Sequence, residues 1–430
     1  MKFMFRFKGI ITIFCLLFSN NIMADDDVRI AIDEGVEMAQ PIAVIPFKVT
    51  ENVPEDVAQI ISDDLRNSGK FTPLSRARMP SNPTSSFEVN AQQWADLGLD
   101  NIVIGQIVTS GSGYNVAYQL IDTLGVSGMA GNVIAQGAFN VPKTQLRLAA
   151  HTLSDEIFEK LTQIKGAFRT KIAYVVQKGV SAYQLRVADY DGHNAFTVVN
   201  SREPLMSPTW SPDGNAIAYV TFENRKSLLV LHNLKNKKRT ILAAYKGHNG
   251  APAFSPDGSK IAFASNRDGV LNIYVKNIYS NHTVQLTRNA GNNTEPSWSP
   301  DSYSIVFTSD RSGIPQVYQM DESGGNVSVI GGSSSYNAKI SSDGKYLIMI
   351  LGDKIMKKDL ITGNTEILSS TFLDETPSIS PNGTMIIYSS TKGMNKVLQL
   401  VSADGRFKAS LPGVGGQYKF PAWSPYLTKQ

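Results

Sequence analysis

The feature that most constrains the fold of this 430-residue chain is a short turn, Ser-Pro-Asp-Gly, that returns at a nearly constant interval. The copies, some of them imperfect, start at Ser211, Ser255, Ser299, Ser341, Ser380 and Ser424. An interval of about 40 to 45 residues that holds several short strands is typical of the blades of a β-propeller. The repeat therefore predicts a ring of blades in the C-terminal part of the chain.

The copy at Ser255 indicates how one blade is built. Alternating apolar and polar residues at 260–265, 270–278 and 282–289 predict three strands. Together with the strand that runs into Ser255, they complete a four-stranded blade. Five copies carry a proline three residues before the serine, and because proline is tolerated at the first residue of a strand, we expect each innermost strand to begin there. These prolines are Pro208, Pro252, Pro296, Pro377 and Pro421, and Ala338 takes this place in the remaining copy.

The aspartate of the turn has two possible roles, as a hairpin residue or as a carboxylate placed for chemistry. Two copies replace it with Asn382 and Tyr426, which a catalytic or metal-binding position would not tolerate. Pro-Asp suits the centre of a type I turn, and glycine suits the left-handed position that follows. We therefore interpret the repeated aspartate as a hairpin residue.

The two ends of the array predict how the ring closes. The copy at Ser424 lies close to the C-terminus and has no second strand after it, whereas Lys171–Val176 has the pattern of such a strand with no turn before it. We infer that the C-terminal strand completes the first blade. This arrangement closes a six-bladed ring over residues 166–430 and leaves no open sheet edge.

A smaller domain with mixed helices and strands precedes the propeller. Apolar periodicity and terminal signals place the helices at 54–69 and 144–166, and alternating or fully apolar runs place the strands at 41–47, 101–108, 114–122 and 133–141. The pattern predicts an α/β domain over residues 41–165, joined to the propeller by the short connection 165–170.

The first 24 residues predict export. Three cations precede an apolar run that is too short to span a bilayer, and a polar stretch ends at Ala24, after which we expect cleavage. Cys15, the only cysteine, is an unsuitable lipoprotein anchor because Phe14 is bulky and Cys15 lies inside the apolar run. We therefore expect a mature chain without disulfides or direct membrane insertion.

Residues 25–40 lie between the signal peptide and the α/β domain. Val-Arg-Ile-Ala-Ile at 28–32 alternates as a strand does, yet no hairpin partner is near it in the sequence. From the pattern alone, this segment is equally an edge strand of the α/β domain or a mobile arm that pairs with another protein.

The sequence holds no recognisable catalytic constellation. There is no P-loop, no Gly-x-Ser-x-Gly, no His-Glu-x-x-His and no pair of cysteines. Asp189-Tyr190-Asp191-Gly192 begins like a calcium loop, but His193 stands where the loop requires an oxygen ligand, so we interpret it as a blade turn. We expect no enzyme, no catalytic residue, no metal and no cofactor.

Charge divides the chain into two parts. Residues 25–165 contain 10 lysines and arginines against 18 acids, a net charge of −8, and residues 166–430 contain 28 against 19, a net charge of +9. The cations of the propeller are scattered and lack interleaved aromatic residues, so we do not expect a nucleic-acid partner. The asymmetry favours docking between the two parts or attraction of an acidic partner to the propeller.

The loops that lead into the innermost strands open on one face of the ring, opposite the turn motifs. They combine charged, apolar and aromatic side chains, a mixture suited to protein recognition. These residues are His248, Glu295, Asp374, Glu375, Met206, Tyr336, Phe372 and Tyr418. We expect the binding surface at this mouth of the channel.

Several long segments resemble the TolB family. They include Pro-Ile-Ala-Val-Ile-Pro-Phe at 41–47, Gly-Ala-Phe-Arg-Thr-Lys-Ile-Ala-Tyr-Val at 166–175, the run around the turn motif of Ser255 at 248–260, and Ser-Ser-Thr-Phe-Leu-Asp-Glu-Thr-Pro at 369–377. The resemblance implies a periplasmic, monomeric, non-enzymatic adaptor of the Tol-Pal system, which supports outer-membrane integrity and constriction during cell division.

The resemblance also implies two partners, and it favours the mobile arm over the edge strand. The peptidoglycan-associated lipoprotein Pal is expected at the channel mouth, on His248, Ala251, Thr294, Glu295, Met206, Leu373, Asp374, Glu375 and Thr376. TolA is expected on the arm, at Val28, Arg29, Ile30, Ile32, Asp33 and Val36. The alternative is a propeller enzyme or a glycan-binding module that uses the central channel.

Overall fold

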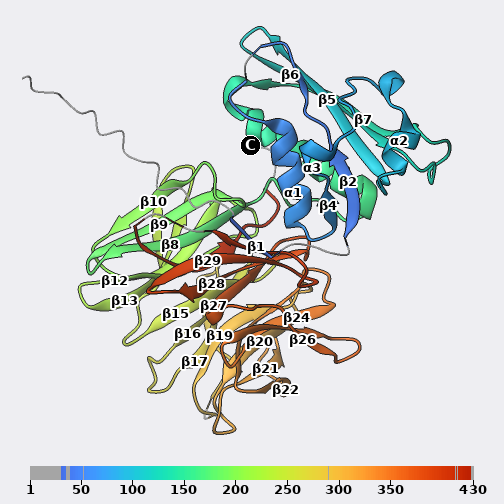
Figure 1. Cartoon of the computed structure of the whole chain (residues 1–430). Helices are drawn as coiled ribbons and strands as arrows, with labels where there is room; N and C mark the ends of the chain where they lie inside the picture. Colours follow the sequence, from blue (N-terminus) through green and yellow to red (C-terminus); the bar gives the residue numbers. More distant parts are fainter. Residues whose placement is uncertain are drawn as a thin grey trace, which may run out of the picture.

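The computed structural model describes residues 31–34, 39–51, 53–288, 290–411, 413 and 415–427. The expected signal peptide with Ala24, and the positions Val28, Arg29, Ile30 and Val36, lie outside these residues. The described chain forms an α/β domain and a six-bladed β-propeller, the two domains that the sequence predicts (Figure 1).

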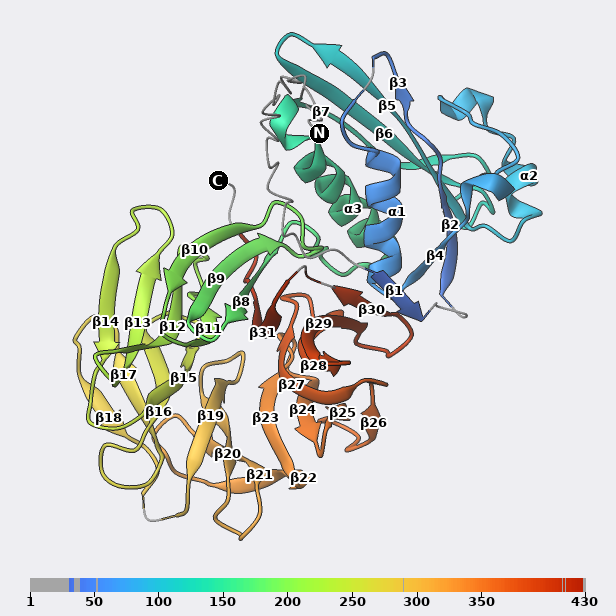
Figure 2. The same cartoon turned by 60° about the vertical axis from the view of Figure 1, so that its left-hand side comes forward.

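The α/β domain is built on a mixed sheet with the order β4-β2-β5-β6-β7, and β3 pairs with β5. Its strands are β2 (Gln40–Val44), β3 (Lys48–Val49), β4 (Phe71–Pro73), β5 (Asn101–Ser110), β6 (Gly113–Asp122) and β7 (Val133–Pro142). Its helices are α1 (Val57–Asn67), α2 (Ala91–Ala95) and α3 (Leu146–Thr162), with short 3-10 turns at Arg76–Arg78, Ser86–Glu88 and Lys143–Gln145. Apolar residues of α1 and α3, among them Ile61 and Ile157, pack in one core with those of the sheet. Figure 2 shows both helices between the sheet and the propeller.

Each blade of the propeller is a four-stranded antiparallel sheet. The first contains β8 (Lys171–Gly179), β9 (Ala182–Asp189) and β10 (Phe196–Ser201). The next two contain β11 (Leu205–Trp210), β12 (Ala216–Glu223), β13 (Lys226–Asn233) and β14 (Arg239–Ala243), then β15 (Asn249–Phe254), β16 (Lys260–Ser265), β17 (Asn272–Asn277) and β18 (Thr283–Gln285).

The remaining blades follow the same plan. They contain β19 (Asn293–Trp298), β20 (Ser304–Ser309), β21 (Gln316–Asp321) and β22 (Ser328–Ser333), then β23 (Ser335–Ile340), β24 (Tyr346–Leu351), β25 (Lys354–Asp359) and β26 (Thr365–Ile367). The last contains β27 (Phe372–Ile379), β28 (Met385–Lys392), β29 (Asn395–Ser402) and β30 (Lys408–Leu411).

The ring closes as the ends of the repeat predict. Strand β31 (Gln417–Trp423) is the innermost strand of the first blade and pairs with β8, with Trp423 opposite Ile172. The indole Nε1 of Trp423 donates to the Thr170 hydroxyl at 2.7 Å, and its ring stacks on Tyr190. The C-terminal segment therefore joins the two ends of the array.

The repeated aspartate is a hairpin residue in the described copies. In the copy at Ser211, the serine hydroxyl donates to Asp213 Oδ1 at 2.6 Å, and that oxygen accepts the Asn215 N–H at 3.0 Å. The glycine of the turn, Gly214, has a φ of +69°, the left-handed position that the sequence predicts. Ser380 donates to Asn382 at 2.8 Å, so the amide makes the same contact as the carboxylate.

The expectation that each innermost strand begins at its proline is wrong. The strands begin earlier, for example at Asn249 rather than Pro252. The proline lies at a β-bulge, where the register with the next strand shifts between Gly250 and Ala253. A bulge leaves one residue out of the ladder, so a residue without an N–H is accommodated there in mid-strand.

The N-terminal segment pairs with the propeller, so its interpretation as an edge strand of the α/β domain is wrong. Strand β1 (Ala31–Glu34) adds to the outer edge of the last blade, antiparallel to β30. Ile32 lies opposite Ala409 in this pairing. The outermost strand of a blade offers unpaired backbone groups, which an extended segment can use.

The α/β domain covers the end of the ring that carries the turn motifs. At the edge of this interface, Asn382 Nδ2 donates to the carbonyl of Lys165 at 3.0 Å, and Lys70 pairs with Asp404 at 3.1 Å. At its centre, the Tyr190 hydroxyl donates to Asp64 of α1 at 2.5 Å. The opposite end, where the innermost strands begin, is the predicted channel mouth.

Candidate binding site in the propeller channel

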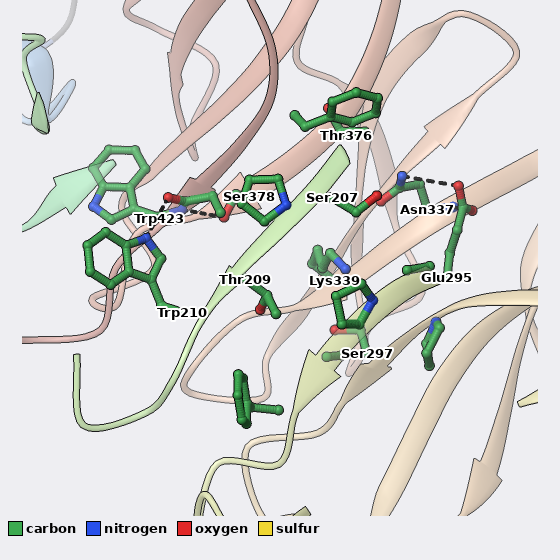
Figure 3. Close-up of a pocket in the computed structure, with 18 of the residues that line it drawn as sticks. Ser207, Thr209, Trp210, Glu295, Ser297, Asn337, Lys339, Thr376, Ser378 and Trp423 are labelled. Carbon is green, nitrogen blue, oxygen red and sulfur yellow. Dashed lines mark hydrogen bonds between the residues drawn. The ribbon is translucent and has the colours of Figure 1, made fainter. Parts of the chain in front are cut away.

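A cavity of about 580 Å³ runs along the axis of the propeller. It extends from His248 and Thr294 at the mouth to prolines of the turn motifs, such as Pro212 and Pro256, at the other end. Its wall is formed by the six innermost strands, β11, β15, β19, β23, β27 and β31. Figure 3 shows side chains of these strands around the cavity.

The bulge of each innermost strand contributes a left-handed residue to this wall. These residues have φ between +48° and +54°, and none is a glycine: Ser207, Ala251, Glu295, Asn337, Thr376 and Phe420. Such a backbone costs about 1–3 kcal/mol for each residue and persists only where the surrounding structure imposes it. A strained conformation at every blade around one cavity marks this ring as a candidate functional site.

Glu295 links two neighbouring blades at this level. Its Oε2 accepts the Thr308 hydroxyl at 2.8 Å and the backbone N–H of Asn337 at 2.9 Å. Its Oε1 accepts Nδ2 of Asn337 at 3.2 Å (Figure 3). The carboxylate thus lines the cavity and also holds the bulge of the next blade.

His248 is held at the mouth by the start of β15. Its backbone N–H donates to Asn266 Oδ1 at 2.6 Å, and the following residue, buried Asn249, donates to the carbonyl of Tyr245 at 2.8 Å. The half-buried ring lies over Gly250, where an added Cβ would come within 2.2 Å of Nε2. Burial lowers the pKa of His248, so a neutral imidazole faces the mouth at neutral pH.

The segment from Phe372 to Thr376 divides between the surface and the interior. Phe372 and Leu373 are exposed, and Glu375 pairs with Lys396 at 2.7 Å. Asp374 is buried; its carboxylate accepts the hydroxyls of Ser369 and, at 2.6 Å, Thr371. Asp374 therefore orders its own loop and does not line the cavity.

The structure gathers most of the predicted mouth residues. Met206, His248, Ala251, Thr294, Glu295 and Thr376 line the cavity together. Leu373, Asp374 and Glu375 lie in the neighbouring segment outside the lining. Tyr336 is half-buried and Tyr418 is fully buried, so Tyr418 offers no contact surface. Sequence reasoning missed Asn337 and Lys339, although the absent proline at Ala338 singled out their repeat.

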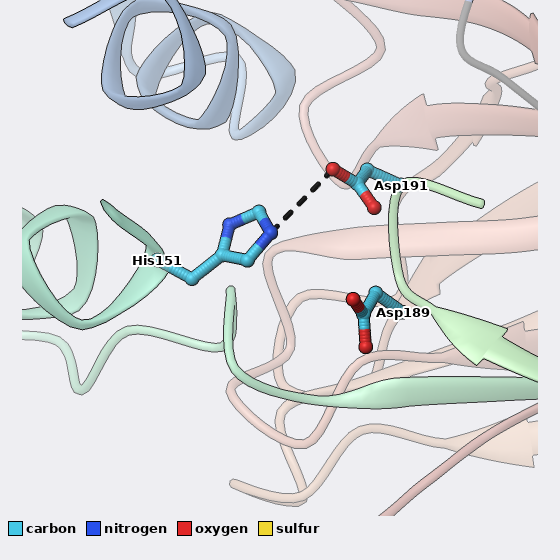
Figure 4. Close-up of side chains that lie close together, drawn as sticks. All are labelled: His151, Asp189 and Asp191. Atoms are coloured by element: carbon cyan, nitrogen blue, oxygen red, sulfur yellow. Dashed lines mark ion pairs between the residues drawn. The ribbon is translucent and has the colours of Figure 1, made fainter. Parts of the chain in front are cut away.

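His151, Asp189 and Asp191 form a second cluster of candidate ligands, between the domains (Figure 4). Asp189 pairs with Lys171 at 2.5 Å, and Asp191 pairs with Arg147 and lies 3.5 Å from Nε2 of His151. Since cations of the protein already neutralise both carboxylates, the cluster is suited to holding the domains together. The backbone confirms Asp189–Gly192 as a turn, with the Gly192 N–H donating to the Asp189 carbonyl at 2.8 Å.

Within the residues that the structure describes, no helix is both long and apolar enough to cross a membrane.

Comparisons with known proteins cover both domains. A family model described as "TolB beta propeller domain" matches residues 158–427, and one described as "TolB amino-terminal domain" matches residues 28–128. The "Tol-Pal system protein TolB" of Actinobacillus pleuropneumoniae serotype 3 is 70% identical over 429 residues, 100% of both chains. The protein with the same description from Haemophilus ducreyi is also 70% identical over 429 residues. The crystal structure of TolB from Acinetobacter baumannii is 36% identical, with a TM-score of 0.85 over 93% of this chain and 100% of that one.

Proposed function

Because the chain belongs to the TolB family, we propose that it is a periplasmic, non-enzymatic adaptor of the Tol-Pal system that binds Pal at the channel mouth and TolA through its N-terminal arm. In this role it supports outer-membrane integrity and constriction during cell division. The protein acts by presenting surfaces to two partners and carries out no chemical step.

The observation that carries the Pal site is the convergence of mouth residues from four blades on one cavity. Met206, Ala251, Thr294 and Thr376 come from β11, β15, β19 and β27, and His248 directly precedes β15. The α/β domain covers the other end of the ring, so this end is open to a partner. Apolar, hydroxyl and imidazole groups in a concave, pre-formed site are suited to anchoring side chains of another protein.

The pairing of β1 supports the arm as the TolA site. Three residue pairs join β1 to β30, with a register irregularity between Ile32 and Glu34. So short a pairing at a blade edge contributes little free energy and can be exchanged for pairing with a partner strand. We propose that the docked arm and the TolA-bound arm are alternatives, and that Pal binding shifts the population between them.

The mouth assignment is tested by His248→Ala, with His282→Ala as the matched control because His282 is exposed on an outer hairpin. Loss of a buried anchor at an interface weakens binding by about 2 kcal/mol or more, so we expect at least a tenfold weaker Kd for the soluble domain of Pal in calorimetry. His282→Ala should bind as the wild type does. Wild-type affinity for both variants would place the Pal interface elsewhere.

Gly250→Ala gives a second test that leaves the imidazole present. The added methyl group occupies the space of the ring, so His248 must leave its position. We expect weaker Pal binding in the same titration and a normal far-ultraviolet circular dichroism spectrum. Unchanged affinity would mean that the position of the ring does not matter for Pal.

The arm is tested by deleting Asp25–Val36. We expect loss of TolA binding in a pull-down, with Pal binding retained, or strengthened because Pal binding no longer has to shift the docked arm. TolA capture equal to that of the full mature chain would overturn the arm assignment.

A further inference from the structure

Lys339 occupies a position in the channel where the other blades carry small residues. In each innermost strand, this is the residue that resumes pairing after the bulge; Lys339 lies opposite Ile348. Its counterparts around the ring are Thr209, Ala253, Ser297, Ser378 and Ala422. All six residues line the cavity. Five small side chains therefore leave space at this level for one long cationic one.

The ammonium group of Lys339 has no partner among the described residues, since no hydrogen bond or ion pair joins it to another described side chain. The acid that affects it most is Glu295, whose oxygens already accept bonds from Thr308 and Asn337. Burial lowers the pKa of Lys339, and Glu295 only partly opposes this effect. Lys339 is half-buried in the channel wall, and a partly desolvated cation without a paired anion is less stable than one whose charge a bound anion offsets.

The neighbours of Lys339 at this level supply further hydrogen-bond donors. Thr209, Ser297 and Ser378 carry hydroxyl groups, and Figure 3 shows them around the same cavity as Lys339. The Ser378 hydroxyl oxygen accepts the backbone N–H of Trp423 at 2.9 Å, which leaves its own proton available for another acceptor. An ammonium group and hydroxyl donors in a confined space are the chemistry that binds carboxylate and phosphate oxygens.

The charge of the propeller favours the same class of ligand. Residues 166–430 carry a net charge of +9, which raises the local concentration of anions at a channel open to solvent. Among the described residues that line the cavity, the charged side chains are Lys339 and Glu295, while His248 is neutral, and the carboxylate of Glu295 is engaged in the wall. Lys339 is thus the group left to interact with an ionic ligand.

We propose that Lys339, with the hydroxyls of Thr209, Ser297 and Ser378, forms an anion site inside the propeller channel that takes a carboxylate or phosphate group. This site lies deeper than the mouth residues and goes beyond the proposed binding of Pal. The ligand is either a free anion or an acidic side chain of a protein docked at the mouth.

The first experiment compares inorganic phosphate and acetate with chloride at constant ionic strength. Lys339→Gln and Lys339→Met remove the charge, and Lys345→Gln is the matched control because Lys345 lies in the same blade with a side chain 68% exposed. We expect phosphate to raise the Tm of the wild type and of Lys345→Gln, and this rise to be lost in both Lys339 variants. An equal response in all four proteins would overturn the site.

Lys339→Arg keeps the charge and should retain the response to phosphate. A direct readout comes from dimethylated lysines followed by ¹H–¹³C NMR, where one resonance absent from Lys339→Met should shift with phosphate. A Lys339 resonance that stays unmoved up to the highest phosphate concentration would also overturn the proposal.

The second experiment uses the soluble domain of Pal to distinguish the two sources of the anion. If an acidic side chain of Pal enters the site, Lys339→Gln weakens Pal binding at least tenfold and phosphate competes with Pal. If free anions occupy it, Lys339→Gln loses the phosphate response but keeps wild-type Pal affinity. Both outcomes support the anion site. Failure of the wild type to bind Pal would overturn the proposed function, while the phosphate experiment would still decide whether the anion site exists.

Discussion

Two histidines, one at each end of the propeller, lie in opposite electrostatic environments: His151 of α3 at the covered end and His248 at the mouth. At the end covered by the α/β domain, Nδ1 of His151 lies 2.8 Å from Asp64, and Nε2 lies 3.5 Å from Asp191. Burial alone would lower the pKa of His151, but these two carboxylates outweigh it and raise the pKa to about 9. At the mouth, burial lowers the pKa of His248, and no charged group among the described residues opposes this effect.

This difference shows that one repeat unit serves two purposes at its two ends. At the covered end, the polar groups are paired with charges from the other domain, and aromatic rings such as Tyr190 and Trp423 stack at 6.1 Å between centroids. At the mouth, the bulges impose a strained backbone and leave side chains facing a cavity. Paired charges stabilise the interface between the domains, whereas unpaired groups on a pre-formed wall are available to bind a ligand.

Deletion of residues 417–430 should have the largest effect, because β31 runs from the mouth to the covered end of the ring and its loss disturbs both. Its Trp423 packs at the covered end and its Tyr418 is buried nearer the mouth. Without β31 the first blade lacks its inner strand, so we expect loss of the cooperative unfolding transition of the propeller in calorimetry. Deletion of 25–36, which removes the edge strand β1, is the control and should leave that transition in place. A cooperative transition in the 417–430 deletion would show that the ring closes without its last strand.

Asp64→Ala should destabilise the covered end without changing the mouth. It removes one of the two carboxylates that face the charged His151, and it removes the acceptor of the Tyr190 hydroxyl. Removing one partner from a buried ion pair costs about 3–5 kcal/mol, measurable as a lower urea midpoint. Asp63→Ala removes a surface pair with Arg66 and an exposed hydrogen bond from the Gln59 amide, and it should cost under about 1 kcal/mol. Equal effects of the two substitutions would argue against a stabilising network at the covered end.

The pH dependence should distinguish the two histidines by sign. The pKa of His151 is higher in the folded state than its ordinary 6.5, so its stabilisation is complete below pH 6.5 and is lost as the pH rises through 9. The difference corresponds to about 3 kcal/mol. For His248, whose folded pKa is lowered, stability is instead lost as the pH falls below 6.5.

The measurement is the urea midpoint from pH 5 to pH 9.5 for wild type, His151→Gln and His248→Gln. We expect His151→Gln to flatten the decline on the alkaline side and His248→Gln to flatten the decline on the acid side. An alkaline slope unchanged in His151→Gln would mean that His151 is not held as the cation.

The smallest expected effect on stability lies at the mouth. Glu295→Ala removes the acceptor of one hydrogen bond from its own blade and two from the next, which should cost about 1–3 kcal/mol in addition to any effect on Pal binding. Glu322→Ala, which breaks a surface pair with Lys260, is the matched control and should cost under about 1 kcal/mol. If Glu295→Ala has the stability of the wild type, its link to Asn337 contributes nothing and the residue is free to serve a ligand alone.

Much of the architecture could be predicted from local pattern. The serine and glycine positions of the turn define the hairpins, their spacing defines the blades, and the unmatched strands near Lys171 and Ser424 indicate the closure. The bulges could not be predicted in this way, because residues such as Ser207 and Ala251 have no side-chain signature of a left-handed backbone. Their conformation is imposed by the pairing of β11 and β15 with the strands behind them.

The candidate site shows the same division. The sequence places His248, Thr294 and Glu295 on mouth loops, because a loop's position in the repeat determines the face on which it opens. It does not show that Asp374 turns inward, since the Ser369 and Thr371 hydroxyls that bind it are presented only by the folded loop.

By itself, the sequence determined the number of blades, the closure and the face of the mouth, since these follow from hydrogen bonding and burial that recur every repeat. The tertiary structure alone decided which residues meet across the molecule. His151 and Asp191 face each other only when the domains dock, and Lys339 reaches the level of Thr209, Ser297 and Ser378 only when the ring closes. Electrostatic energy depends on distances between residues far apart in the chain, and only the closed fold sets those distances.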